Sequence, residues 1–235
     1  GNQNLSWLKN PSKTKKICSY ADLVTVGNKY LADFALSYNK NVKIIPTVVD
    51  TKYHKAYPLN NKKEKICIGW TGTETTLKHF ETAIPHLKNL YNKYGDKIKF
   101  RVIVNFPYER NDIPLEVIQW NKFNEIEKLS EIDIGIMPLP NNKWSKGKCG
   151  FKGIQYMSLE IPSIMSPVGV NNEIINDGVN GFLADNSNDW IEKLSRLIDS
   201  EELRKKLGKA GRRTIIKHFS NKAWQDEFLK ILNEL

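Results

Sequence analysis

The residues best suited to chemistry lie in residues 137–184, which read MPLPNNKWSKGKCGFKGIQYMSLEIPSIMSPVGVNNEIINDGVNGFLA. A short apolar run ends there, a loop rich in glycine and lysine follows, and a helical pattern begins near Phe151. Lys146, Lys148 and Lys152 would therefore surround a helix N-terminus, whose free N–H groups and positive dipole end attract anions. The pattern predicts an anion site suited to a diphosphate. The alternative for these lysines is a solvated loop.

Gln155 is the second candidate in this segment. It follows Lys152 by three positions, so both side chains would lie on one face of the predicted helix. A side-chain amide both donates and accepts hydrogen bonds, which suits vicinal hydroxyls such as those of a ribose. The alternative is an interior amide that bonds to the backbone.

A second possible anion site lies upstream, in the segment IGWTGTETTLKHF at residues 68–80. A predicted strand ends near Gly72, and a helix begins among Thr73, Thr75 and Thr76. Small residues let a phosphate approach the backbone, and hydroxyls can donate to it. The alternative is an ordinary strand-to-helix turn capped by threonines. The segment matches neither GxGxxG nor the phosphate-binding loop that ends in Gly-Lys-Ser/Thr.

The elements that must position these residues alternate along the chain. Short apolar runs predict strands at residues 65–70, 98–104, 117–120, 132–137, 163–166 and 181–184. Amphipathic patterns predict helices at residues 76–94, 121–129, 151–159 and 171–175. This alternation predicts an α/β fold with a Rossmann-like, doubly wound parallel sheet, in which both anion sites converge at the carboxyl edge.

The end of the chain is predicted to be helical. Helices are expected at residues 189–198, 200–216 and 220–235, and Ser200 and Ser220 are placed to cap the last two.

Four parts of the chain are expected. Residues 1–50 hold one β-α-β unit, interpreted as the end of an otherwise missing N-terminal domain because so short a unit buries little core. Residues 51–64 form a linker without hydrophobic period, 65–219 form the main domain, and 220–235 form a helix that returns toward the N-terminal part. The other possibility is that residues 1–50 dock on the main domain as an integral part of it.

Composition narrows the function classes. The formal net charge of +10 favours anionic partners, and the excess of lysine is spread along the chain. The sequence contains no stripe of arginines interleaved with aromatic residues, so nucleic-acid binding is not predicted. No apolar run reaches the length of a membrane span, so a cytoplasmic protein is expected. The three cysteines show no paired spacing, and neither a disulfide nor a metal site is predicted.

The run GKCGFKGIQYMSLEIPSIMSPVGVNNEIINDGVNGFLA, together with IGWTGTETTLKHF, resembles the C-terminal, donor-binding half of family 4 glycosyltransferases of the two-Rossmann GT-B fold. The similarity covers about residues 20–220. It implies retaining transfer of a hexose-type sugar from a UDP- or GDP-type donor, without a metal ion or other cofactor, to a glycan or lipid-linked acceptor. A missing N-terminal domain would bind that acceptor, a peripheral contact with the inner membrane face is implied, and the chain alone would be inactive.

The sequence departs from the family pattern at three positions. The family has two glutamates eight positions apart, the first on the donor sugar and the second on the ribose, and here these positions hold Gly147 and Gln155. Trp70 occupies the place of an expected arginine. The resemblance therefore implies that Gln155 binds the ribose and that lysines supply the missing positive charge.

The site expected from these arguments has three parts. The residues assigned to the diphosphate are Gly72, Thr73, Thr76, Lys148, Gly150, Phe151 and Lys152. Gln155 is assigned to the ribose, and Gly147 and Glu173 to the side of the sugar. Of the two roles open to Glu173, capping of a helix is favoured over approach to the sugar. No catalytic residue is assigned, and the four histidines are interpreted as surface or helix-face residues.

Two other functions share some of these features. A sugar-nucleotide epimerase of the same architecture would need acid and base carboxylates at the cleft, and Gly147 and Gln155 argue against it. A non-catalytic basic module that binds nucleic acid or membrane is supported by charge alone. A nicotinamide dehydrogenase is disfavoured by the missing GxGxxG motif.

Overall fold

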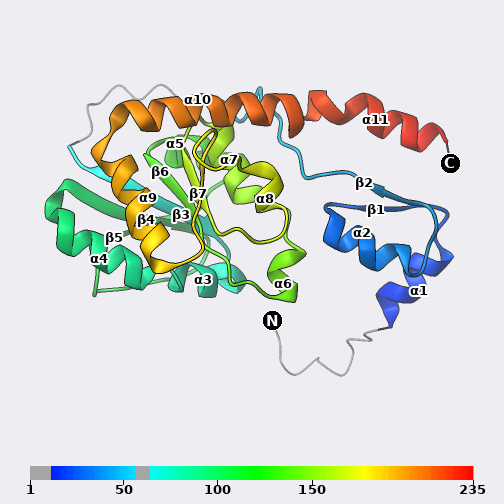
Figure 1. Ribbon diagram of the computed structural model, residues 1–235, viewed down its shortest axis with the longest axis horizontal. Helices are drawn as coiled ribbons and strands as arrows, with labels where there is room; N and C mark the ends of the chain where they lie inside the picture. The colour runs from blue at the N-terminus through cyan, green and yellow to red at the C-terminus, as the bar shows by residue number, and fades with distance from the viewer. Residues whose placement is uncertain (1–11, 57–63, 235) are drawn as a thin grey trace.

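The main body of the protein is a six-stranded parallel sheet with helices on both faces (Figure 1). The computed structural model describes residues 12–56 and 64–234. The strands of this sheet are β3 (Ile66–Gly72), β4 (Ile98–Val104), β5 (Leu115–Gln119), β6 (Ile134–Met137), β7 (Ser163–Met165) and β8 (Phe182–Leu183). All six predicted strands are therefore present, with ends shifted by a few residues. The doubly wound α/β fold is confirmed.

The strand order places the site. The order is β5-β4-β3-β6-β7-β8, so the chain reverses direction across the sheet between β3 and β6. Every neighbouring pair is parallel; β3 pairs with β4 from Ile66–Ile98 to Gly72–Val104. In such sheets ligands bind outside the carboxyl ends of the strands, at the point of reversal. That point lies beyond Gly72 and Met137.

The helices that cover the sheet are α3 (Glu74–Glu81), α4 (Ile84–Tyr94), α5 (Glu125–Ser130), α6 (Lys143–Lys146), α7 (Phe151–Ser158), α8 (Asn171–Ile174), α9 (Ser187–Asp199) and α10 (Glu201–His218). A short 3₁₀ turn, Gly95–Lys97, leads into β4. Alternate strand residues face opposite sides: Ile68 and Trp70 pack with Phe80 of α3, whereas Cys67 packs with Tyr156 of α7. This two-sided burial explains why the strands are continuous apolar runs.

One predicted helix is interrupted. Residues 76–94 form α3 and α4, separated at Thr82 and Ala83. Pro85 lies in the first turn of α4, where a missing N–H costs nothing, but within a continuous helix its ring would clash with the preceding turn. The sequence reasoning also missed α1 (Lys13–Tyr20) and the one-turn α6.

The N-terminal part contains its own small sheet. Helix α1 is followed by β1 (Val24–Val26), α2 (Lys29–Leu36) and β2 (Val42–Ile44), and β1 pairs with β2 in parallel. The predicted β-α-β unit is thus present. Several of its large apolar side chains are exposed, among them Tyr20, Phe34, Leu36 and Ile44.

The last helix, α11 (Asn221–Asn233), extends from the end of α10 over this small unit (Figure 1). Ser200 and Ser220 cap α10 and α11 as predicted: their hydroxyls accept from the N–H groups of Leu203 and Ala223, each at 3.1 Å. Val49 exchanges backbone hydrogen bonds with Phe219 and Asn221, which ties the chain after β2 to the start of α11.

The linker predicted at residues 51–64 is described only in part, because residues 57–63 lie outside the described ranges. Its first turn is held to the main body by Arg212 of α10, which donates to the carbonyls of Thr51, His54 and Ser158. None of the described helices is both long enough and apolar enough to cross a bilayer.

Amide hydrogen exchange is expected to be faster in residues 22–46 than in β4. The two-stranded sheet leaves apolar side chains exposed, whereas β4 is buried between β5 and β3 in a six-stranded sheet. Exchange measured by mass spectrometry on dilute protein checks this. Equal protection of the two segments would contradict the interpretation of residues 1–50 as part of a missing domain.

Candidate functional site

A hollow of about 350 Å³ lies where the strand order predicts a ligand. It is bordered by the carboxyl ends of β3, β4 and β5, by the first residue of α5 and by the first turns of α3 and α7. The residues that line it are Thr71, Gly72, Thr73, Thr76, Asn105, Trp120, Glu125, Phe151, Lys152 and Gln155. Six of the ten predicted site residues are among them: Gly72, Thr73, Thr76, Phe151, Lys152 and Gln155.

The threonines of the anion site predicted upstream, at residues 68–80, form the cap of α3. The hydroxyl of Thr76 accepts from the N–H of Thr73 at 3.0 Å and donates to the carbonyl of Thr73 at 3.0 Å. The capping alternative considered for this turn is therefore what these side chains do. Gly72 and the cap still line the hollow. Because the Thr76 hydroxyl is used within the cap, this turn would offer a ligand its backbone N–H groups.

Lys152 is the principal cation of the hollow. It lies in the first turn of α7, with its ammonium group 5.4 Å from the centre of the Trp70 ring. Burial, followed by the nearby charge of Lys148, lowers the pKa of Lys152 to about 8. Within the described ranges, no carboxylate forms an ion pair with this lysine. An anion entering the hollow would meet a desolvated, uncompensated cation.

Trp70 therefore has a structural role in place of the arginine that the family resemblance leads one to expect. Its side chain is 1% exposed and packs against Phe80, with ring centres 5.3 Å apart. The indole face thus lies beneath the Lys152 ammonium group and forms part of the surroundings that bury it.

Lys148 lies beside the hollow without lining it. Its ammonium group is 5.6 Å from the ring centre of Trp144, and burial lowers its pKa. The loop that carries it is held by Asn28 of the N-terminal unit, whose side-chain amide donates to the carbonyls of Lys146 at 3.4 Å and Lys148 at 3.0 Å. The lysine loop is thus not simply solvated.

The backbone at Gly150 turns this loop into α7. Gly150 caps the helix with φ +70°, a left-handed conformation that glycine adopts without strain. A Cβ at this position would overlap the side chain of Ile174. Gly150 therefore contributes to the site by aiming the helix N-terminus and does not line the hollow itself.

Gln155 is 3% exposed and does not bond to the backbone as the alternative supposed. Its Nε2 donates to the Oε1 of Glu125 at 3.1 Å, and both residues border the hollow. Because a carboxylate only accepts hydrogen bonds, the partner fixes which end of the amide points toward Glu125.

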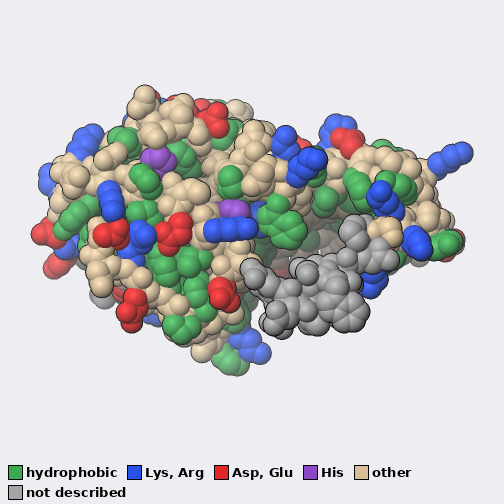
Figure 2. Space-filling view, turned by 90° about the horizontal axis from the view of Figure 1, so that it is seen from below, with side chains coloured by type: hydrophobic (Ala, Val, Ile, Leu, Met, Phe, Trp, Pro, Cys, Tyr) green, Lys and Arg blue, Asp and Glu red, His purple; other side chains and the backbone are tan. Residues whose placement is uncertain are grey.

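His79 corrects the interpretation of the histidines as surface or helix-face residues. It is 3% exposed, and its Nε2 has no hydrogen-bond partner among the described residues. Burial, followed by the charges of Lys148, Lys78 and Lys152, lowers its pKa to about 4. The inward face of α3 thus places a neutral imidazole beside the lysines. Seen from below, basic side chains border a histidine near the middle of the molecule (Figure 2).

The two residues assigned to the sugar side are not brought to this hollow. Gly147 follows α6, where a Cβ would lie 3.5 Å from Leu31 of the N-terminal unit. Glu173 borders a different hollow, of about 590 Å³, shared with Ile44, Lys217 and Trp224. Neither residue lines the hollow that contains Lys152.

Sequence reasoning missed four lining residues, Thr71, Asn105, Trp120 and Glu125. Asn105 follows β4 directly and Trp120 follows β5 directly. Because the carboxyl ends of parallel strands share one edge, their positions were a usable signal. Glu125 gave no such signal, since its contact with Gln155 spans 30 positions in the sequence.

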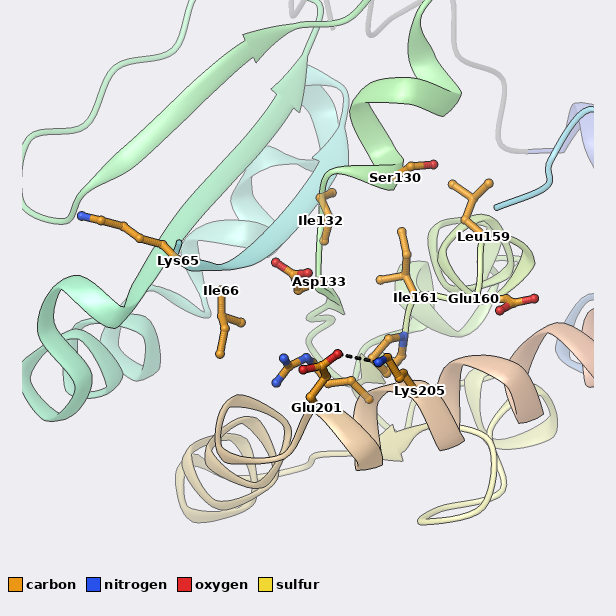
Figure 3. Close-up of a pocket in the computed structure, with 12 residues that line it drawn as sticks. Lys65, Ile66, Ser130, Ile132, Asp133, Leu159, Glu160, Ile161, Glu201 and Lys205 are labelled. Carbon is orange, nitrogen blue, oxygen red and sulfur yellow. Dashed lines mark ion pairs between the residues drawn. The ribbon is translucent and has the colours of Figure 1, made fainter. Parts of the chain in front are cut away.

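A hollow of about 430 Å³ at the opposite edge of the sheet differs from the candidate site (Figure 3). Lys65 and Asp133 lie there, each immediately before a strand, so this is the amino edge. Its charged groups already have partners: Glu201 pairs with Lys205, and Asp133 accepts from the N–H of Cys67 at 2.8 Å. Among the described residues, no group of three or more His, Cys, Asp or Glu side chains is placed to hold a metal ion.

Residues 116–214 match the sequence model of the family described as glycosyl transferases group 1. An uncharacterized glycosyltransferase from Methanocaldococcus jannaschii is 28% identical over 228 residues, which are 93% of this chain and 61% of the relative. The chain thus spans less than two thirds of that protein's length.

Solved structures show the same fold. Sucrose-phosphate synthase from Thermosynechococcus elongatus superposes with a TM-score of 0.77 at 15% identity, covering 100% of this chain and 64% of the synthase. The Anabaena protein HepE, solved in complex with UDP-glucose, gives 0.73 at 12% identity, covering 94% of this chain and 66% of HepE. The chain thus shares its fold with these structures, and residues 116–214 match the group 1 glycosyltransferase family.

Proposed function

We propose that this chain is the donor-binding, C-terminal half of a family 4 glycosyltransferase, and that it binds a UDP- or GDP-type sugar nucleotide for retaining transfer of a hexose-type sugar. The observation that carries the proposal is the hollow at the reversal of the sheet. A half-buried lysine at a helix N-terminus, with no ion-pair partner among the described residues, borders it together with a pair of groups suited to ribose hydroxyls and an aromatic ring at the end of β5.

The proposed chemistry is electrostatic. As the bond to the sugar breaks, negative charge gathers on the diphosphate leaving group, and fixed positive groups stabilise it. Lys152 and the N-termini of α3 and α7 are placed for this role, with Lys148 beside them. The binding requires no metal ion in this proposal.

The proposed function also needs a second domain, which lies outside this chain. An N-terminal domain would pack on the exposed apolar side chains of residues 12–50, bind the glycan or lipid-linked acceptor and complete the active site. Support comes from the exposed Phe34, Leu36 and Ile44, and from the share of the archaeal relative that this chain covers. The chain alone would bind the donor without turning it over.

Nucleotide binding tests the proposal. UDP or GDP should raise the melting temperature in a concentration-dependent manner, because a ligand that binds only the folded state stabilises it. EDTA should leave this rise unchanged, and the nucleotide that gives the larger rise identifies the base. Binding that depends on added magnesium or manganese would contradict the lysine-based site, and no rise with either nucleotide would contradict the function.

The affinity for the diphosphate is expected to fall as the pH rises above about 8. The free protein loses the Lys152 proton in that range, since the pKa of Lys152 is lowered to about 8, whereas a bound diphosphate would keep the proton on. Binding at pH 9.5 should therefore take up a proton and be about 5- to 30-fold weaker than at pH 7. Calorimetry in buffers of different ionisation enthalpy measures both quantities.

The matched control is Lys152→Arg, because a guanidinium stays charged throughout this range. The variant should lose most of the pH dependence. If it weakens with pH as the parent does, another group titrates.

A further inference from the structure

The candidate site contains a carboxylate that none of the diphosphate contacts uses. Of the ten residues that line the hollow, all within the described part of the chain, Glu125 alone carries a negative charge. It is half-buried and is the first residue of α5, where the positive end of a helix favours a carboxylate. It therefore introduces one negative charge into a site otherwise suited to an anion.

The position of Glu125 gives this charge a role. Gln155 follows Lys152 by one turn of α7, and its amide donates to the carboxylate at 3.1 Å. A carboxylate offers about four acceptor positions, and this bond uses one of them. The remaining acceptors suit a group with two adjacent donors. Such a group would lie one helical turn from the site of the diphosphate.

We propose that Glu125 accepts hydrogen bonds from the vicinal ribose hydroxyls of the nucleotide, and that Gln155 is a positioning residue that holds the carboxylate from the buried side. The inference rests on the proposed donor-binding function. An amide oxygen can accept from the diol but brings no charge, whereas hydrogen bonds to a carboxylate are shorter and stronger. Position 155 holds an uncharged glutamine, so the negative charge at the ribose would come from Glu125 of α5.

The other groups of the hollow support this assignment. Lys152 of α7 lines it together with Asn105 and Trp120, which follow β4 and β5. Glu125 and Gln155 join α5 to α7 within the same hollow. A nucleoside diphosphate carries a matching set of groups, namely charged phosphates, a ribose diol and an aromatic base.

The experiment compares UDP with 2′,3′-dideoxy-UDP, and GDP with its dideoxy analogue, by calorimetry on the parent chain and on Glu125→Gln. The parent should prefer the nucleotide with both hydroxyls by about tenfold or more. Glu125→Gln, which keeps size and shape, should reduce this preference to below about threefold without weakening the dideoxy analogue. Glu127→Gln is the matched control. Glu127 lies two positions further along α5 and does not line the hollow, so this variant should behave as the parent.

The double variant Glu125→Gln with Gln155→Glu separates binding from folding. It keeps one amide and one carboxylate in contact, so it should fold as the parent does, but it leaves an uncharged amide at position 125 and should therefore not restore the preference for ribose. It also serves as the informative variant if Glu125→Gln melts far below the parent, because it restores the bond between the two side chains without a carboxylate at position 125.

Two results would overturn the proposal while leaving the donor-binding function intact. One is an unchanged ribose preference in Glu125→Gln, and the other is an equal loss of the ribose and dideoxy nucleotides. Failure of the parent to bind either nucleotide would instead reject the donor-binding function, and the ribose assignment with it.

Discussion

Replacing Lys152 with alanine is expected to weaken UDP or GDP binding by about 10- to 150-fold, because a charge-assisted contact of this kind contributes about 1.5–3 kcal/mol. The parent lysine is held over Trp70 without an ion-pair partner among the described residues, so its charge is available to a diphosphate. Folding should change little, since removal of a desolvated cation offsets the loss of its contact with the indole. Calorimetry and thermal melting measure the two effects separately.

Lys146→Ala is the matched control. Lys146 is exposed, is the last residue of α6 and does not line the hollow, so its removal should weaken binding far less. If Lys152→Ala binds nucleotide as tightly as the parent, the anion site predicted around Lys152 is misplaced and the lysines form a solvated surface.

Gly208→Ala is expected to destabilise the protein substantially. Gly208 lies in α10, and a Cβ there would overlap the backbone carbonyl of Glu160, just beyond α7. Alanine alone favours a helix by about 1 kcal/mol over glycine, so any net loss reports the clash. Backbone cannot move aside as a side chain can, and a net loss of about 2 kcal/mol or more should lower the melting temperature by about 4–8 °C.

The control for this prediction is Lys209→Ala, at the next position of α10, where the side chain is exposed. It should melt within about 1 °C of the parent, because exposed substitutions change stability by less than about 0.5 kcal/mol. A Gly208→Ala protein that melts at or above the parent temperature would show that α10 can shift away from Glu160. The close packing of these elements would then not limit stability.

The location of the site at the carboxyl edge of the sheet could be predicted from the sequence, because it depends on how strands and helices alternate along the chain. Apolar runs such as residues 98–104 encode buried strands, and their alternation with helices fixes a parallel sheet with all carboxyl ends on one edge. The shared face of Lys152 and Gln155 also followed from helix periodicity, since the two positions are three apart. Ser200 and Ser220 were recognised as caps for the same local reason.

Other outcomes depended on contacts between distant segments. The partner of Gln155 is 30 positions away, and the support for the lysine loop comes from Asn28, 118 and 120 positions away. No periodicity reports such pairs, because they form only when separate elements pack. Glu173 was assigned to the site from its position after a strand, yet α8 turns it into another hollow.

The residue types and their spacing thus determined a doubly wound sheet with a basic helix N-terminus at its edge. Tertiary structure alone decided which groups share the hollow and what their electrostatics are. Lys152 and His79 are ordinary basic side chains in the sequence, and only their burial in the fold and the charges of neighbouring lysines lower their pKa values. The physical reason is that desolvation depends on every element packed around a group, whereas sequence patterns record the preferences of one element at a time.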